Sequence, residues 1–315
     1  MPGTYTHLTI TSLLTGGNKM EEIDLLEGAT RALRKFSHFC DMGAISPDYP
    51  YLKIFGRGRK AARNWANAMH HKYGTYTQKN ILHVGIDYIK GLSGNNRDKC
   101  LSWFLGYASH VTADVTCHPM TNLLVGDYEA DNQTSHRESE MHQDVYIYNK
   151  KLQRRVRAAE HVQNVVGSCV DLDSEKIDSE INQIWTHMLS ETFPALRRRY
   201  KRIDIDNWHD CVQSLIDDFA EEFPYFPTRH IIGEGLVYPN VDDVDVDKFV
   251  NNLNTPLGVM SYDDVFDRAL YNTGRVWKMI SDAVFLDDEA YLANIGIWNL
   301  DSGQVVKTPK VMWEG

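Results

Sequence analysis

The chain is short of cysteine. It has five in 315 residues, at positions 40, 100, 117, 169 and 211. None of them are spaced as CxxC, and their odd total disfavours a disulfide framework. We therefore expect reduced thiols and a reducing compartment, with Cys117 as a small buried thiol.

Long apolar runs are also missing. No stretch approaches the roughly 20 apolar residues that a membrane-spanning helix needs. The first residues, MPGTYTHLTITSLLTGG, have only a brief apolar run with no basic region before it, so they do not resemble a secretory signal. We expect a soluble protein that is cytoplasmic or exported by a signal-independent route.

The chain has fewer basic than acidic residues. It contains 33 lysines and arginines and 43 aspartates and glutamates, which gives a net charge of -10. This balance argues against general affinity for nucleic acid or anionic membranes, although a local basic patch or bound metal can override it. We interpret the runs RRRYKR at 197–202 and DDVDVD at 242–247 as solvated surface. The chain also lacks the HExxH, GxxxxGK[ST] and GxSxG motifs of three large enzyme classes.

Strand-like alternation is scarce, whereas apolar residues recur at helical spacing in segments such as 25–36 and 61–69. The pattern predicts an all-α fold, a multi-helix bundle. Two prolines and three glycines interrupt it at 41–58, which indicates an ordered loop able to aim Asp48 at a site. We expect the last helix, about 261–285, to pack back on the core.

The most informative segment is WFLGYASHVTADVTCH, residues 103–118, which is otherwise fit for a core. His110, Asp114 and His118 are spaced four apart, so each side chain is turned only about 40° from the previous one on a helix. Buried imidazoles and carboxylates need a partner, and several aligned pairs favour a metal. Pro119 predicts that the helix ends at His118. His118 would then turn toward a second metal ion, with Asp114 as the bridge between the two.

Further ligand-type residues lie in other segments. In SHRESE, His136 and Glu140 repeat the four-residue step, and we prefer them to Glu138 and His142, which lie about 200° around the same helix. His70 is the better inward candidate of the adjacent pair at 70 and 71. The complete set of candidates is His7, Asp48, His70, His110, Asp114, His118, His136 and Glu140.

Five stretches carry a resemblance to a known family: PGTYTHL, GAISPDYPY, WANAMHHKYG, FLGYASHVTADVTCH and SHRESE. Together they resemble the bacterial zinc-dependent phospholipase C family, which is similar in fold and site to the single-strand-specific zinc nucleases. The resemblance covers about the first half of the chain. It implies a helical catalytic domain over 1–200, in which the eight candidates hold two or three zinc ions. Residues 201–315 would form a helical C-terminal extension packed on the same core.

This resemblance implies a zinc-dependent phosphodiester hydrolase, most simply a phospholipase C that cleaves glycerophospholipids to diacylglycerol and a phosphorylated head group. Zinc ions neutralise phosphoryl oxygens and lower the pKa of a bound water, which attacks phosphorus. Asp48 would orient or deprotonate that water. The expected partner is phospholipid, with transient contact to a membrane surface.

Two alternatives stay open. A single-strand nuclease or nucleotidase would use the same site, and Tyr49, Tyr51, Tyr73 and Tyr76 are candidates for stacking on bases. A non-catalytic, metal-stabilised helical protein would instead show closed coordination with no open position for water.

Overall fold

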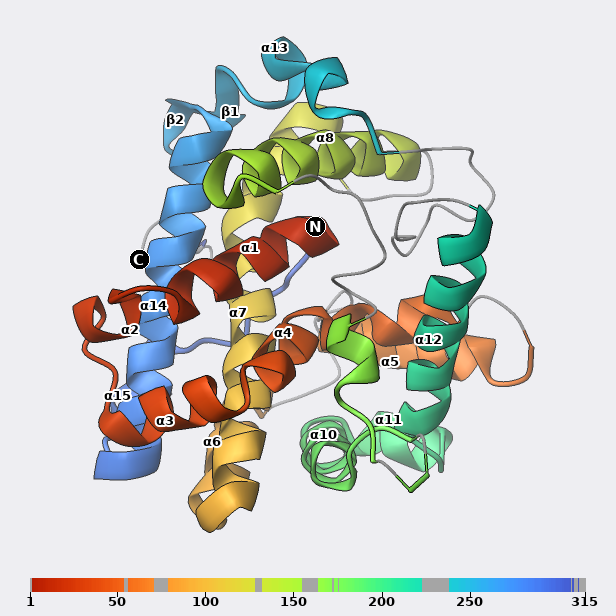
Figure 1. The fold of residues 1–315 in the computed structure, drawn as a ribbon, viewed down its shortest axis with the longest axis vertical. Coiled ribbons are helices and arrows are strands. Elements are labelled where there is room, and N and C mark those ends of the chain that lie inside the picture. The colour runs from red at the N-terminus through yellow and green to blue at the C-terminus, as the bar shows by residue number, and fades with distance from the viewer. Residues whose placement is uncertain are drawn as a thin grey trace.

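The chain folds as a bundle of helices with one small β-hairpin (Figure 1), as the sequence predicts. The computed structural model describes residues 2–53, 56–70, 79–127, 132–154, 164–171, 173–174, 176–222, 238–306, 308 and 311. Its elements are α1 (Thr4–Thr15), α2 (Lys19–Glu22), α3 (Glu27–Lys35), α4 (Ser37–Ile45), the 3-10 helix η1 (Ser46–Leu52), α5 (Arg59–Met69), α6 (Ile81–Lys90), α7 (Gly94–Val125), α8 (Gln133–Leu152), α10 (Ser179–Thr192), α11 (Pro194–Arg199), α12 (Ile205–Glu222), η3 (Val241–Asp243), α13 (Val246–Phe249), β1 (Leu253–Thr255), β2 (Gly258–Met260), α14 (Tyr262–Leu286) and α15 (Ala290–Asn294).

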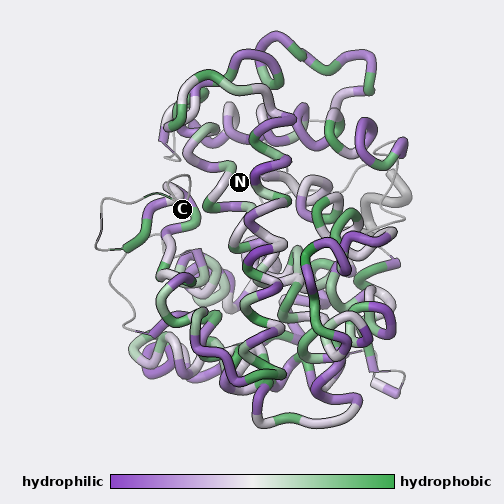
Figure 2. The backbone as a smooth tube through the Cα atoms, turned by 90° about the vertical axis from the view of Figure 1, so that its left-hand side faces the viewer, coloured by the Kyte–Doolittle hydropathy of each residue, from purple (hydrophilic) through white to green (hydrophobic). Residues whose placement is uncertain are grey.

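Helix α7 is the centre of the bundle. Figure 1 shows it running through the middle of the molecule, with α14 beside it and α8 across one end. Every residue of α7 from Cys100 to Thr121 is buried, as in a helix surrounded by others. Figure 2 shows hydrophobic and hydrophilic residues mixed along the helices on the side that faces the viewer. Within the described residues, no helix is both long enough and apolar enough to span a membrane.

The packing of α4 on α7 depends on two glycines. A Cβ atom at Gly43 would overlap the carbonyl oxygen of Trp103, and one at Gly106 would overlap the carbonyl oxygen of Cys40. The two contacts are reciprocal, so the helix backbones touch at this crossing. Only glycine leaves room for such an approach.

Helix α14 packs along the other side of α7. The Trp277 indole Nε1 donates a hydrogen bond to the Leu105 carbonyl, at 2.8 Å, and Asn272 Nδ2 lies 3.2 Å from Thr116 Oγ1. Apolar side chains of α14 and α7 belong to one buried cluster. The helix expected at about 261–285 is therefore present, one residue displaced at each end, but it is not the last, because the short α15 follows it. The domain boundary expected at residue 200 stays a prediction.

The expectation that the central helix ends at His118 is wrong, because α7 continues to Val125 with Pro119 inside it. Proline removes one backbone hydrogen bond and crowds the carbonyl four residues earlier, here that of Val115. Gly303 lies against this carbonyl and the proline ring, where a Cβ atom would clash. The Asn122 side chain also donates to the Asp301 carbonyl, at 2.8 Å. The C-terminal turn, which contains Asp301 and Gly303, thus supports α7 where Pro119 weakens it.

The loop expected at 41–58 is in part helical. Its first five residues complete α4, and 46–52 form the 3-10 helix η1. The Ser46 hydroxyl donates to the Met42 carbonyl, at 2.8 Å, and accepts from the Trp103 indole, at 3.0 Å. Pro47 fits the first turn of η1, where no intrahelical N–H bond is lost. The segment that carries Asp48 is therefore a rigid turn.

We predict that Gly106→Ala destabilises the protein by about 2 kcal/mol, because the new methyl group forces α4 away from α7. Gly167→Ala is the matched control, since Gly167 is helical and no neighbouring atom lies near its Cβ position. The control should be neutral or slightly stabilising, by up to about 1 kcal/mol. Urea unfolding measures both. Equal stability of the two variants would contradict the role of the close crossing.

Candidate metal centre

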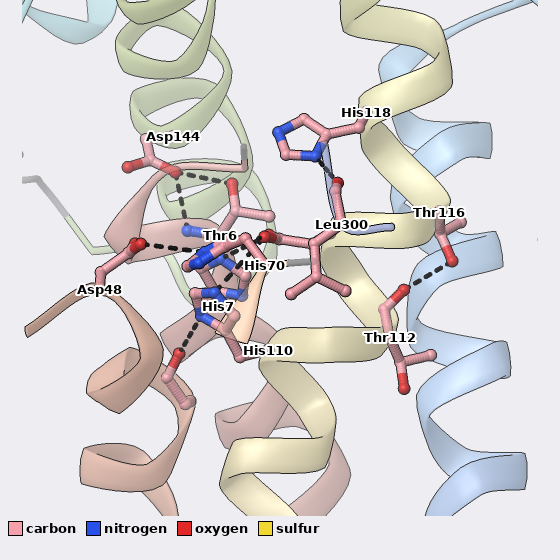
Figure 3. Close-up of polar contacts among 12 residues, drawn as sticks. Thr6, His7, Asp48, His70, His110, Thr112, Thr116, His118, Asp144 and Leu300 are labelled. Carbon is pink, nitrogen blue, oxygen red and sulfur yellow. Dashed lines mark hydrogen bonds and ion pairs between the residues drawn. The ribbon is translucent and has the colours of Figure 1, made fainter. Parts of the chain in front are cut away.

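Five of the eight candidate ligands converge from four elements. His7 comes from α1, Asp48 from η1, His70 from the C-terminal end of α5, and His110 and Asp114 from α7. Figure 3 shows the three imidazoles gathered together, with Asp48 pointing toward them. Four of the side chains are no more than 1% exposed, whereas Asp48 is 23% exposed. Asp48 is thus the member that solvent reaches.

Asp114 is at the centre of this group. Its Oδ1 lies 3.3 Å from His7 Nε2, and its Oδ2 lies 3.4 Å from His110 Nε2 and 3.7 Å from His70 Nε2. The rings of His7 and His110 stack at 4.1 Å, with an angle of 13° between their planes. Both oxygens of one buried carboxylate therefore face imidazole nitrogens.

Asp48 extends the group on the side of His70. Its Oδ1 lies 3.4 Å from His70 Nε2. The donor atoms form two sets of three, and the atoms of each set lie within 4.8 Å of one another. One set comes from His7, His110 and Asp114, and the other comes from Asp48, His70 and His110. His110 belongs to both sets, so the sets adjoin.

The donor atoms of the group fit zinc. Nε2 of His7, His70 and His110 and both oxygens of Asp114 are buried without a hydrogen-bond partner, which is costly for polar atoms. Two donor atoms bound to one tetrahedral zinc at about 2.1 Å are about 3.4 Å apart, close to the separations seen here. Imidazole and carboxylate are also ligand types that zinc accepts.

Backbone carbonyls orient two of the imidazoles. His70 Nδ1 lies 2.8 Å from the Ala66 carbonyl oxygen, and His110 Nδ1 lies 2.8 Å from that of Ala44. A carbonyl oxygen only accepts, so each ring carries a proton on Nδ1 and presents Nε2 to the group. Metal-binding histidines commonly have this arrangement. For His110 it depends on the close crossing of α4 and α7, which brings Ala44 near.

Charge in the group centres on Asp114. Burial alone would raise the pKa of Asp114, because it favours the neutral acid. The positive charge of His110 and the close side-chain contacts of His110 and then His7 outweigh burial, and they hold the pKa of Asp114 well below its usual value. Burial opposes a proton on His110 as well, yet the nearby Asp114 charge raises the pKa of His110. Burial and the neighbouring His110 lower the pKa of His7. The carboxylate is therefore ionised and needs a positive charge beside it. Either a protonated imidazole or a metal ion supplies that charge.

His118 lies outside this group. Its Nδ1 is hydrogen-bonded to the Leu300 carbonyl oxygen, further along α7 than His110 (Figure 3). Its Nε2 is buried without a partner, and burial lowers the pKa of His118 to about 3. The ring is therefore a neutral imidazole with its Nε2 lone pair available. Its role as a ligand stays a prediction.

His136 and Glu140 face inward from α8, as their spacing predicts. They are 0% and 5% exposed. The rival Glu138 is at the surface, where its Oε2 pairs with Lys248 Nζ at 3.2 Å. His136 Nε2 lies 2.6 Å from the Gly126 carbonyl oxygen, so this ring presents Nδ1. Neither residue joins the two sets of donor atoms found in the described chain, and their ligand roles stay predictions.

The neighbours of Asp114 come from more segments than the sequence indicates. The sequence suggested that it bridges a first ion and a second one held by His118, and that role stays a prediction. Its two oxygens face His7 on one side and His70 with His110 on the other. This arises because α1 and α5 both reach α7 at the level of Asp114, which helical spacing alone does not reveal.

Asp144 supports the group and was missed in the sequence. It is fully buried on α8, and its carboxylate accepts hydrogen bonds from the backbone N–H groups of Tyr5 and Thr6, at 3.1 and 2.8 Å. It also accepts from the Thr6 and Tyr238 hydroxyls, at 2.7 and 3.1 Å. It thus caps the first turn of α1, one residue before His7. The spacing of 136, 140 and 144 could have revealed it.

We predict that Asp144→Asn flattens the pH dependence of stability. Burial, opposed by these hydrogen bonds, raises the pKa of Asp144 from 3.8 to about 7. The folded protein therefore keeps a proton that the unfolded chain releases near pH 4. The resulting stability is present below that pH and is lost as the pH rises toward about 7. The measurement is urea unfolding across this range, with a chelator present so that metal release does not contribute.

Asp41→Asn is the control for this experiment. Burial raises the pKa of Asp41 to about 6, against a hydrogen bond from Thr11. This variant should remove only the slope between about pH 4 and 6. An Asp144→Asn protein that keeps the wild-type slope between about pH 6 and 7 would show that Asp144 is not the group responsible.

Comparison with known proteins identifies the family. Neither the curated proteins nor the solved structures gave a significant match. The family model described as zinc dependent phospholipase C matches residues 6–195, which is more than half of the chain and includes all eight candidate ligands. The chain belongs to the zinc-dependent phospholipase C family, and it is a phospholipase C-like hydrolase.

Proposed function

We propose that this protein hydrolyses the phosphodiester bond of glycerophospholipids, releasing diacylglycerol and a phosphorylated head group. The observation that supports it best is the asymmetry of the five-residue group, in which Asp48 is 23% exposed and the other four residues are buried. A closed structural site would shield every ligand. Here one carboxylate at the edge faces both solvent and His70.

The residues of the group would hold zinc as follows. His7, His110 and Asp114 would hold one ion, and Asp48, His70 and His110 offer donors for an adjoining one. The buried His118 and the inward pair on α8, His136 and Glu140, are the further candidates. When bound, zinc supplies positive charge for the phosphoryl oxygens and lowers the pKa of water.

Two carboxylates of the protein have separate roles in the reaction. Asp48 accepts a proton from the attacking water, because it is the carboxylate that solvent reaches. The water oxygen forms a bond to phosphorus as the bond between phosphorus and the glycerol oxygen breaks, and the glycerol oxygen takes up the proton that Asp48 accepted. Asp114 keeps its negative charge and orients the imidazoles through both oxygens. No covalent intermediate with the protein is required.

Nucleic acid is the alternative substrate, and the described aromatic residues favour it less. Tyr49 was a candidate for stacking on bases, but its ring is 1% exposed and packs near Trp185 and His209. Tyr51 is half-buried, lies next to His70 and donates a hydrogen bond to Asn67. The other two candidates, Tyr73 and Tyr76, lie outside the described residues.

The first test combines metal content with substrate choice. We predict that the purified protein contains zinc and hydrolyses phosphatidylcholine, and that chelation abolishes hydrolysis and zinc addition restores it. The same preparation is assayed on a simple phosphodiester and on single-stranded DNA. Absence of stoichiometric zinc would refute the metal centre, and DNA cleavage without lipid turnover would select the nuclease.

The second test separates the two carboxylates. Asp114→Asn should remove zinc and activity together, because Asp114 contacts three imidazoles. Asp48→Asn should retain most zinc and lower kcat by about 10² to 10⁴, the range for loss of a general base. Zinc content is measured by elemental analysis beside the rate. Equal zinc loss in both variants would contradict the separate role of Asp48.

A further inference from the structure

Two basic segments that are far apart in the sequence meet in the fold. One is the start of α5 with the turn before it, and the other is the end of α11 with the residues after it. Asn64 Nδ2 on α5 donates a hydrogen bond to the Tyr200 hydroxyl, at 3.2 Å. We define the basic face as the exposed cations of these segments, which are Arg57, Arg59, Lys60, Arg63, Arg198, Arg199, Lys201 and Arg202.

The charge of the basic face is largely uncompensated. Arg202 pairs with Asp204, at 2.9 Å. The other seven members form no ion pair with any side chain that the structure describes. Four other surface lysines, in contrast, are paired with carboxylates: Lys19, Lys150, Lys151 and Lys248. A strongly positive area therefore exists on a chain whose net charge is -10, and it creates a local field that net charge conceals.

The basic face is connected to the candidate metal centre through α5. This helix begins at Arg59 and ends beside His70, whose ring faces Asp48. The length of α5 is roughly 16 Å, at about 1.5 Å per residue. The Tyr51 hydroxyl also donates to Asn67, at 2.9 Å, and ties η1 to the same helix. A surface bound at the start of α5 would thus lie about one length of this helix from the end that carries His70.

We propose that the basic face docks the protein on an anionic phospholipid bilayer. This inference rests on the proposed function, since it places the enzyme on the surface that contains its substrate. Clustered lysines and arginines bind membranes that carry anionic lipids by charge attraction. An extended, negatively charged surface would attract the cations of both segments, which adjoin at Asn64 and Tyr200.

The basic face fits a membrane better than single-stranded nucleic acid. Proteins that bind single strands combine a basic groove with several open aromatic rings. Among the described residues, the aromatic ring at the contact between the two segments is that of Tyr200, which is half-buried, and the Arg199 guanidinium lies 5.5 Å from its centre. The cations are instead exposed along the first half of α5, at the end of α11 and on the residues beside these two helices.

The test measures binding without turnover. The full-length, zinc-loaded protein carries Asp48→Asn, so that vesicles are not consumed. Sedimentation is measured with phosphatidylcholine vesicles that do or do not contain phosphatidylglycerol, at about 0.1 M salt. We expect binding to the anionic vesicles and little binding to the neutral ones. Equal binding to both would overturn the proposal.

The deciding variant replaces Arg59, Lys60, Arg63 and Lys201 with glutamine. Loss of each cation should weaken binding about fivefold, so the four together should weaken it several hundredfold. The pair Arg57→Gln and Arg198→Gln should weaken it about 25-fold. The matched control replaces Lys19, Lys150, Lys151 and Lys248 with glutamine, and it changes net charge by the same amount. Equal loss in the control and the four-residue variant would overturn the proposal.

Two further measurements separate docking from catalysis. Zinc-loaded proteins that retain Asp48 are compared on a soluble short-chain phosphatidylcholine, where wild type and the four-residue variant should have equal rates. Failure of wild type to hydrolyse it would refute the proposed function, and the vesicle binding would still decide docking. A wild-type protein that binds single-stranded DNA but no anionic vesicle would overturn docking in favour of nucleic acid.

Discussion

The arrangement of the bundle centres on the buried carboxylate of Asp114. Asp114 is 0% exposed in the middle of α7, and both of its oxygens lack hydrogen-bond partners. Such a charge is expensive in an apolar interior unless positive charge or polar groups face it. His7, His70 and His110 surround it, which requires α1 and α5 to meet α7 at one level. Zinc binding is the simplest way to balance this charge in a member of a zinc-dependent family.

The surrounding packing fixes the direction of each imidazole. The reciprocal contact of Gly43 and Gly106 brings the Ala44 carbonyl to His110, and this sets the ring nitrogen that faces inward. On the opposite side, Asp144 caps α1 and holds the helix turn that carries His7. The C-terminal turn supports α7 at Pro119 and places the Leu300 carbonyl against His118. Residues with no ligand role thus decide whether the ligands converge.

Charge is distributed unevenly over the molecule in a way that matters for a lipid enzyme. Four surface lysines elsewhere pair with carboxylates, whereas only Arg202 of the basic face does so among the side chains that the structure describes. An acidic protein is repelled by an anionic membrane in most orientations, so the basic face would select the orientation of the docking that we propose. The connection through α5 relates that orientation to the exposed Asp48.

The sequence by itself determined the helical class, the inward pairs on α7 and α8, and the family, because these depend on spacing within single segments. It gave the wrong helix end at Pro119, since the support for that helix comes from Gly303, more than a hundred residues later. Tertiary structure decided that Asp114 faces His7 and His70, that Asp144 caps α1, and that the two basic segments adjoin. These are contacts between distant segments. Periodicity shows which side of a helix is buried, and only the packed fold shows what that side meets.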